Sequence, residues 1–396
     1  MTEAELITWV KQHHGKIYLV GGAVRDQILG KMPADKDYVI TGISLDDINF
    51  PKIAGRDFPV FLVNLDGAMV EVALARSEKK VGVGYSGFEF YTDPSITIEQ
   101  DLLRRDLTIN AMAIELDTRE FIDPYGGLWD LSDRLLRHTS EAFRDDPLRP
   151  YRVARFASKF GYRVHPTTRQ MMLGLKSELS ALTPERVALE LSKALVEQYP
   201  DKFFRELEGL LDVHFPEIEA LKVPDKHDNT AFEHTLACLY RGRNLYERFS
   251  LLVHDLGKGL SEHPPAHCGH DKHTHLVYNL GERLRLPNKL VAFGATVMAT
   301  HMKLKHLDEM RPGKLFKLIK DKSIFKLLRL SYLESGNRYD KQLYRKHVAL
   351  AKKVLRIRKS IRGQVLLDKG VMPDQYFGDK LLQEWIREFK KQKNAG

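Results

Sequence analysis

Strand-forming residues are concentrated in the first third of the chain, and this uneven distribution limits the folds that are possible. Short runs of β-branched and aromatic residues occur before about residue 125, whereas the pattern after Phe143 has the spacing of helices and keeps it. The expected strands are 17–20, 38–40, 59–63, 70–74, 111–115 and a short sixth at 121–122. The sequence therefore predicts an α+β protein, with a small α/β domain followed by an all-helical remainder.

A chain of 396 residues is too long for one small core, and clusters of turn residues indicate where it divides. These clusters lie near 145–147, near 223–224 and around 335–337. The predicted parts are a head at 1–140, a helical neck at 141–223, a helical body at 224–335 and a basic helical tail at 336–396.

Two short motifs between residues 19 and 40 indicate a nucleotide site. Gly21 and Gly22 follow an expected strand, so backbone N–H groups can approach phosphate oxygens there, and Arg25 adds positive charge for the same anion. Asp35 and Asp37 are two residues apart on the next expected strand, so both project to one face, where paired carboxylates hold Mg²⁺. Each motif alone is common as a turn or a solvated strand end. Their order favours a triphosphate site followed by a metal site, the layout of two-metal nucleotidyl transfer.

A second polar segment extends this site. Arg105 can clamp phosphates with its two-pronged guanidinium, and Asp106 and Asn110 can hold a ribose or orient that arginine. Glu71 is a candidate third carboxylate, with a surface glutamate as the alternative. The segment 79–91 is rich in Gly and aromatic residues, which is typical of a mobile loop near a nucleotide.

A third motif begins with an Asp cap, and Pro147 predicts the first turn of a helix. The charged residues of this helix recur every three positions and so lie near one face; they are Asp146, Arg149, Arg152 and Arg155. A carboxylate accepts from an exocyclic amine and a guanidinium donates to ring acceptors, so Asp146 with Arg149 can read cytosine or adenine and reject uracil and guanine. The alternative is a surface ion pair worth about 0.5 kcal/mol.

The net charge of +9 is concentrated toward the C-terminus. Residues 303–362 contain 19 Lys and Arg against 5 Asp and Glu, so the rest of the chain is acidic. A basic helical stripe of this kind suits the phosphate backbone of a nucleic acid, and a solvated lysine-rich face is the alternative.

Taken in order, the Gly21-Gly22-x-x-Arg25, Asp35-x-Asp37, Arg104-Arg105-Asp106-x-x-x-Asn110 and Asp146-x-x-Arg149 motifs resemble those of class II tRNA nucleotidyltransferases, the bacterial CCA-adding enzymes. The resemblance covers nearly the whole chain. It implies a polymerase-β-like head, a neck that serves as a protein template for CTP and ATP, and a body and tail that hold the tRNA acceptor arm. Pro150 departs from the family pattern, in which an aliphatic residue is usual, and residues 1–15 are an additional amphipathic helix.

The resemblance also implies roles for single residues. Asp35 and Asp37 take the catalytic and Mg²⁺-binding roles. Nucleotide-binding roles fall to Gly21, Gly22, Arg25, Arg105, Asp106, Asn110, Asp146, Arg149, Arg152 and Arg155.

Ten of the sixteen histidines lie between His227 and His306, which indicates a second metal centre. The candidate ligands are His234, His254, Asp255, His267, His270 and His301. Imidazole and carboxylate together suit a divalent transition metal, or Mg²⁺, that activates water for phosphoester hydrolysis. The set resembles an HD-type phosphohydrolase domain, although neither Asp271 nor Asp308 is a convincing closing aspartate.

We expect a cytoplasmic protein with no membrane segment, because the chain has two cysteines, no long apolar run and no signal peptide. We expect it to be a monomer or a homodimer. The expected substrates are tRNA, CTP and ATP. The alternatives are an enzyme that adds only the terminal adenosine, a poly(A) polymerase, a metal-dependent phosphohydrolase acting on tRNA ends, and a passive RNA-binding module.

Overall fold

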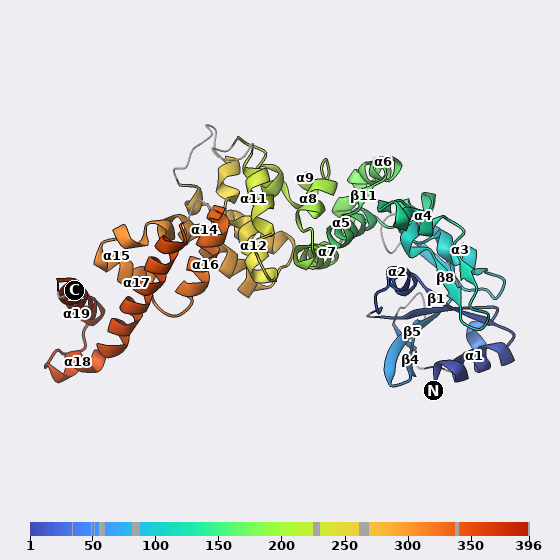
Figure 1. Ribbon diagram of the computed structural model, residues 1–396, viewed down its shortest axis with the longest axis horizontal. Coiled ribbons are helices and arrows are strands. Elements are labelled where there is room, and N and C mark those ends of the chain that lie inside the picture. Colours follow the sequence, from blue (N-terminus) through green and yellow to red (C-terminus); the bar gives the residue numbers. More distant parts are fainter. Residues whose placement is uncertain are drawn as a thin grey trace. The chain divides into compact units, whose positions relative to one another are not determined.

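The computed structural model describes residues 1–33, 35–48, 50, 52–54, 60–80, 88–224, 230–260, 269–336 and 340–394. The chain forms two compact units, Met1–His214 and Phe215–Gly396 (Figure 1). The finer division into head, neck, body and tail stays a prediction.

The first unit contains a seven-stranded sheet with the order β3-β4-β5-β2-β1-β8-β9. Strands β2 and β5 run parallel, and the other neighbouring pairs are antiparallel. The strands are β1 (Lys16–Val20), β2 (Asp37–Thr41), β3 (Lys52–Ala54), β4 (Val60–Leu65), β5 (Ala68–Leu74), β8 (Ala113–Glu115) and β9 (Phe121–Ile122). The predicted α+β class is confirmed. The strand expected at 111–115 begins later, because Thr108–Asn110 forms a 3₁₀ turn, η3, just before it.

Four strands outside the prediction form two small sheets. Strands β6 (Ser77–Lys80) and β7 (Phe88–Tyr91) pair antiparallel, so the ends of the segment expected to be a loop are strands. Residues 81–87 of that segment lie outside the described residues. Strands β10 (Leu135–Leu136) and β11 (Arg163–Val164) pair in parallel.

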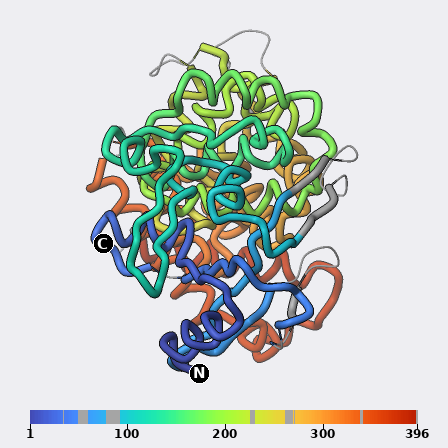
Figure 2. Tube along the Cα trace, turned by 90° about the vertical axis from the view of Figure 1, so that its right-hand side faces the viewer, coloured from blue at the N-terminus to red at the C-terminus, as the bar shows by residue number. Residues whose placement is uncertain are grey.

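Helices cover both faces of the main sheet. Val39 belongs to a buried cluster with Ile98 and Leu102 of helix α3 (Ile98–Leu103). The next residue back along β2, Tyr38, points to the opposite face, where its hydroxyl donates to the Glu3 carboxylate of helix α1 (Glu3–Gln12) at 2.8 Å. Helix α1 is the predicted N-terminal helix, and it lies in dark blue beside the first strands (Figure 1 and Figure 2).

The rest of the first unit is helical, with α5 at its centre, packed against α7 and α8. Its remaining helices are α2 (Gly22–Ile28), α4 (Gly127–Ser132), α5 (Arg149–Phe160), α6 (Pro166–Gly174), α7 (Pro184–Val196), α8 (Asp201–Glu206) and α9 (Leu211–His214).

Helix α5 begins at Arg149, so the predicted start at Pro147 is wrong. Residues 147–148 form a turn in which the Asp146 carboxylate accepts from the Leu148 N–H at 3.0 Å. Pro150 is therefore the second helical residue rather than the fourth, a position where a missing N–H costs no intrahelical bond.

No strand occurs among the described residues of the second unit. Its helices are α10 (Pro216–Glu219), α11 (Ala231–Leu239), α12 (Leu245–Val253), α13 (His275–Arg283), α14 (Asn288–Lys305), α15 (Pro312–Leu318), α16 (Ile324–Ser335), α17 (Lys341–Ser360), α18 (Gly363–Asp368) and α19 (Phe377–Asn394). Helix α17 buries His347, Ala351, Val354 and Ile357 on one face. Basic residues such as Lys352 and Arg356 are exposed on the same helix. Among the described helices, none has the length and apolarity needed to cross a membrane.

Candidate active site

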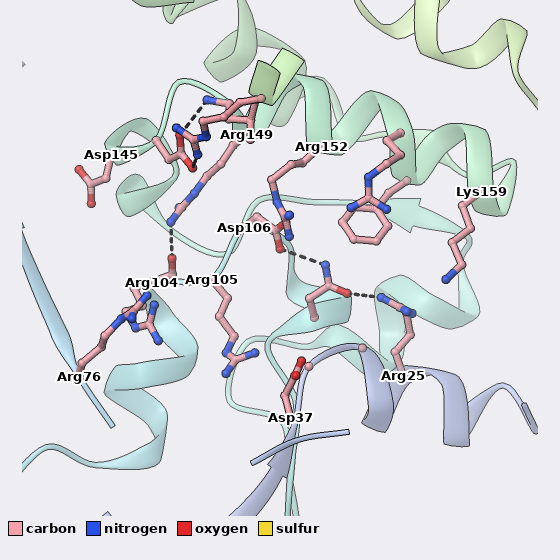
Figure 3. Close-up of a pocket in the computed structure, with 18 residues that line it drawn as sticks. Arg25, Asp37, Arg76, Arg104, Arg105, Asp106, Asp145, Arg149, Arg152 and Lys159 are labelled. Carbon is pink, nitrogen blue, oxygen red and sulfur yellow. Dashed lines mark hydrogen bonds and ion pairs between the residues drawn. The ribbon is translucent and has the colours of Figure 1, made fainter. Parts of the chain in front are cut away.

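A polar cavity of about 530 Å³ in the first unit brings together all ten residues predicted to bind a nucleotide and one predicted Mg²⁺ ligand, Asp37 (Figure 3). The ten residues are Gly21, Gly22, Arg25, Arg105, Asp106, Asn110, Asp146, Arg149, Arg152 and Arg155. The cavity is also lined by Arg76, Arg104, Asp145, Leu148, Phe156, Lys159 and Arg186, which carried no predicted role. Nine cationic side chains against four carboxylates make it suitable for a polyanion such as a triphosphate.

The two glycines leave space for arginine side chains. Gly21 has a φ of +66°, and a Cβ atom there would lie 2.7 Å from the Arg105 Nη1 atom. A Cβ atom at Gly22 would lie 3.3 Å from the Arg25 Nη2 atom. The backbone conformation at Gly21 therefore requires glycine, whereas the end of the Arg105 side chain could shift away from a Cβ atom.

A buried chain of hydrogen bonds connects α2 to α5 (Figure 3). The Arg25 guanidinium donates to the Asn110 side-chain oxygen, whose amide donates to the Asp106 carboxylate at 3.0 Å. The other Asp106 oxygen accepts from Arg152 Nε at 2.8 Å. Burial alone would raise the pKa of the Asp106 carboxyl, but Arg152, Asn110 and Arg149 together hold that pKa well below its usual range. Asp106 therefore stays ionised and fixes Arg152, and Asn110 fixes Arg25.

Arg105 is oriented by a residue outside the prediction. Asp101 is fully buried on α3, and its carboxylate accepts from Arg105 Nη2 at 3.1 Å and from Arg104 Nη2 at 2.6 Å. Both arginines lie one helical turn from Asp101, at i+3 and i+4. That spacing is visible in the sequence and could have identified Asp101.

Of the three carboxylates predicted at the parallel pair of strands, Asp37 lines the cavity, whereas Asp35 and Glu71 do not. Asp37 is the first residue of β2, and its register partner on β5 is Glu71, the candidate third carboxylate. Desolvation by the cavity walls raises the pKa of Asp37, Arg105 lowers it, and the charge of Asp35 raises it. Asp35 lies in a bend before β2, so the expected placement of both aspartates on one strand is wrong. This donor set of oxygen atoms fits a hard divalent cation in its chemistry.

The residues predicted to read the base are held from several directions. The Arg149 guanidinium donates to the Ala142 and Arg104 carbonyl oxygens, each at 2.7 Å. The Asp146 carboxylate accepts from Arg186 Nη2, on α7, at 2.8 Å. Arg155 pairs with the buried Glu190 at 2.5 Å and lies over the Phe156 ring. Arg186 and Glu190 come from a helix far along the chain, so no local pattern identified them.

Four of the six predicted ligands of the second centre meet inside the second unit. His234 on α11, His254 and Asp255 after α12, and His301 on α14 are all at most 5 % exposed. The Asp255 carboxylate oxygens lie 3.2 Å from His254 Nε2, 3.8 Å from His234 Nε2 and 3.6 Å from His301 Nε2. Burial and the neighbouring His254 lower the pKa of His234 to about 4. His267 and the His270 side chain lie outside the described residues.

A buried glutamate that was not predicted lies beside the histidine centre. Glu334 on α16 is buried, with its Oε1 atom 4.0 Å from His254 Nε2. Asp271 pairs with Lys303 at 3.1 Å, and Asp308 pairs with Lys346 and His347. The resemblance implies a closing aspartate, so the sequence prediction did not include Glu334.

Comparison with known proteins identifies relatives of this chain. The family described as Poly A polymerase head domain matches residues 17–137, and the probable RNA and SrmB-binding site of polymerase A matches residues 161–222. Curated proteins named "Multifunctional CCA protein" from Acinetobacter baumannii are 43% identical over 326 residues, which is 77% of this chain and 78% of theirs.

Solved structures show the same fold at low identity. The Thermotoga maritima CCA-adding enzyme complexed with tRNA has a TM-score of 0.67 and 22% identity, over 97% of this chain and 89% of that one. The Bacillus stearothermophilus CCA-adding enzyme in complex with CTP has a TM-score of 0.65 and 23% identity, over 96% and 90%. With the 43% identity to the curated relatives, the conclusion is that the chain belongs to the family of the multifunctional CCA proteins, which are tRNA nucleotidyltransferases.

Proposed function

We propose that this protein adds CMP, CMP and AMP, taken from CTP and ATP, to the 3′ end of tRNA without a nucleic acid template. The observation that carries the proposal is the cavity itself, which combines the Asp37 carboxylate, a cationic wall and the Asp146–Arg149 segment. Relatives named for CCA, at 43% identity, support it.

Asp35 and Asp37 would hold Mg²⁺, and Glu71, the register partner of Asp37, is the candidate third carboxylate. When bound there, Mg²⁺ supplies charge that acidifies the attacking 3′-OH and stabilises the leaving pyrophosphate. Arg105, held by Asp101, and Arg25, held by Asn110, present fixed guanidinium groups to the triphosphate. Because these groups are oriented before the nucleotide enters, little ordering is required during the reaction.

Base choice rests with Asp146 and Arg149, at the start of α5. The Asp146 carboxylate accepts from the exocyclic amine that cytosine and adenine share, and the Arg149 guanidinium donates to the adjacent ring acceptor. Uracil and guanine present the opposite pattern at these positions and leave both protein groups unpaired. Hydrogen bonds from Arg149 to two backbone carbonyls fix the guanidinium plane, which supports this role.

The remaining alternative within this chemistry is addition of the terminal adenosine alone. The test is product length on tRNA transcripts that end at the discriminator base, at C or at CC, incubated with Mg²⁺, CTP and ATP. Full CCA on the shortest transcript is expected. A single A added only to the CC end would make the protein an A-adding enzyme, and no extension of any transcript would refute nucleotidyl transfer.

A second activity is supported by the histidine centre. His234, His254, Asp255 and His301 converge in the second unit, and such a set binds divalent metals that activate water for phosphoester hydrolysis. The substrates would be 2′,3′-cyclic phosphates, 2′-nucleotides or simple phosphate esters. Hydrolysis that survives Asp37→Ala and is lost in His254→Ala would establish it, and hydrolysis unaffected by His254→Ala would exclude this centre.

The basic helices of the second unit are the proposed contact for the tRNA acceptor arm.

A further inference from the structure

The N-terminal helix α1 has no part in the proposed function, although one of its side chains bonds to the strand that carries Asp37. Glu3 is the first residue of α1, and its carboxylate accepts a hydrogen bond from the Tyr38 hydroxyl at 2.8 Å. The same carboxylate lies 3.7 Å from Lys36 Nζ. Lys36 and Tyr38 are the chain neighbours of Asp37, so Glu3 contacts the residues on both sides of the predicted catalytic carboxylate.

The bond between Glu3 and Tyr38 lies on the far face of β2 from Asp37. Tyr38 is 2 % exposed, and a buried hydroxyl needs a hydrogen-bond partner, which the Glu3 carboxylate provides. Successive side chains of a strand point to opposite faces. A tyrosine ring that is fixed on one face therefore limits the rotation of the strand and, with it, the direction in which Asp37 points on the other face.

The start of α1 is also fixed to the hairpin beside β2. The Glu3 N–H donates to the Asp66 carboxylate at 3.2 Å, and the Asp66 N–H donates to the Met1 carbonyl at 3.2 Å. Asp66 belongs to the turn between β4 and β5, and β5 carries Glu71, the register partner of Asp37. Glu3 therefore connects the beginning of β2 to the hairpin that carries the candidate third carboxylate.

The rest of α1 anchors Glu3. Leu6 and Val10 are buried, so the helix is packed against the sheet. At the helix start, the Glu5 N–H donates to the Thr2 hydroxyl at 3.2 Å, and the Thr2 N–H donates to the Glu5 carboxylate at 2.8 Å. This reciprocal cap fixes the first turn, in which Glu3 lies.

We propose that Glu3 is a positioning residue for Mg²⁺-dependent nucleotide addition, which holds Tyr38 and thereby fixes the direction of the Asp37 carboxylate. The hydrogen bond to Tyr38 carries this role, because Lys36 is about half exposed and solvent screens its ion pair with Glu3. The inference rests on the proposed nucleotidyl transfer, in which Asp37 is a Mg²⁺ ligand. A ligand group that is oriented in advance costs less ordering when it binds.

The first experiment measures CTP binding to the full-length protein without tRNA, by calorimetry, with Mg²⁺ and then with a chelator in its place. The cavity arginines contact the triphosphate in both conditions, whereas Asp37 contributes when Mg²⁺ is present. Glu3→Ala should weaken CTP binding by about two- to tenfold with Mg²⁺, the factor that one hydrogen bond supplies, and should leave binding unchanged with the chelator.

Three further variants make this measurement specific to the bond between Glu3 and Tyr38. Glu3→Gln keeps an acceptor for the hydroxyl and should bind CTP as the wild type does. Tyr38→Phe should have the effect of Glu3→Ala, and the double variant should show no additional loss. Glu5→Ala is the matched control, because it weakens the cap of the same helix and keeps the bond to Tyr38.

The second experiment measures amide hydrogen exchange in the unliganded proteins, which reports on the strand without any nucleotide. Residues 36–39 should exchange about two- to tenfold faster in Glu3→Ala than in Glu5→Ala. Equal exchange in these two variants would overturn the inference. So would wild-type CTP binding in Glu3→Ala, an equal loss of binding with the chelator, or a Glu3→Gln protein as weak as Glu3→Ala.

Failure of the proposed function has a different result. A wild-type protein that extends no tRNA transcript would refute nucleotidyl transfer. The exchange rates would then still support or overturn the hold of Glu3 on β2, because they require neither CTP nor Mg²⁺.

Discussion

Arg186 on α7 donates to the Asp146 carboxylate, with Nη2 2.8 Å from Oδ2, although 40 residues separate the two along the chain. Asp146 is the proposed acceptor for the base amine, and a guanidinium on one carboxylate oxygen fixes the direction of the other. Arg186 would therefore position Asp146 for the proposed contact with the base.

Replacing Arg186 with Ala should lower the discrimination between correct and incorrect nucleotides by about tenfold, because a well-oriented base contact is worth about 1–3 kcal/mol. The measurement is the ratio of kcat/KM for CTP and ATP to that for UTP and GTP. Arg169→Ala is the matched control, because Arg169 pairs with Glu206 in the same unit and does not line the cavity. Unchanged discrimination in Arg186→Ala would remove this residue from base choice.

Asp37→Ala should abolish nucleotide addition while tRNA binding is retained. Loss of several kcal/mol of transition-state charge stabilisation corresponds to a fall of at least about a thousandfold in rate. Primer extension measures the rate, and a filter-binding titration measures the tRNA affinity. Asp117→Ala, at a surface ion pair with Lys11, should leave both unchanged. Substantial residual turnover in Asp37→Ala would contradict the assignment of the catalytic carboxylate.

Asp101→Asn should raise the KM for CTP and ATP by about tenfold and lower the free energy of unfolding by about 2–3 kcal/mol, because it removes the negative partner of Arg104 and Arg105. Steady-state kinetics and urea unfolding measure the two effects. Asp130→Asn is the control: Asp130 is buried and pairs with Arg137 outside the cavity. It should lose similar stability without the change in KM. If Asp101→Asn and Asp130→Asn have the same KM for CTP and ATP, Asp101 has no specific role in orienting Arg105.

The ion pair between Asp308 and α17 should contribute stability that disappears in acid. Hydrogen bonds from the Lys346 and His347 side chains lower the pKa of Asp308 to about 2 in the folded protein, below its ordinary value of 3.8. The contribution is therefore present above about pH 4 and is lost as the pH falls toward 2. Because Lys346 is well exposed, we expect about 0.5–1 kcal/mol.

Thermal unfolding of the wild type and of Asp308→Asn at pH 5 and pH 3 checks this prediction. The difference in Tm between the two proteins should shrink at the lower pH. A difference that stays constant would show that the pair stabilises the fold by packing alone.

The pattern of neighbouring residues predicted those strands and helices that depend on short-range sequence. Alternating β-formers located the main strands, and the change to helical spacing after Phe143 gave the α+β class, which the structure confirms. The short pair β10 and β11 has no such pattern, since two residues near 135 meet two near 163 only through the fold. The start of α5 was missed because Pro147 suits a helix start equally well, whereas the chain first makes a turn there.

The candidate site likewise contains residues that the sequence motifs identified and residues that they did not. Most of the cavity side chains lie within recognisable motifs, and their proposed roles stay predictions. Partners that fix those side chains, such as Arg186, Glu190 and Glu334, come from distant helices. Their contribution depends on packing, which one sequence does not reveal.

The parallel register that places Glu71 beside Asp37 also determines where the chain can tolerate insertions and deletions. Side chains alternate between the two faces of a strand, so one residue inserted in β5 ahead of Glu71 would turn this glutamate away from Asp37 while leaving every motif readable. The connection between β2 and β3 has no such constraint, because its length does not determine which face Glu71 occupies. Homologues should therefore vary in length within that connection and keep a fixed count within the strand.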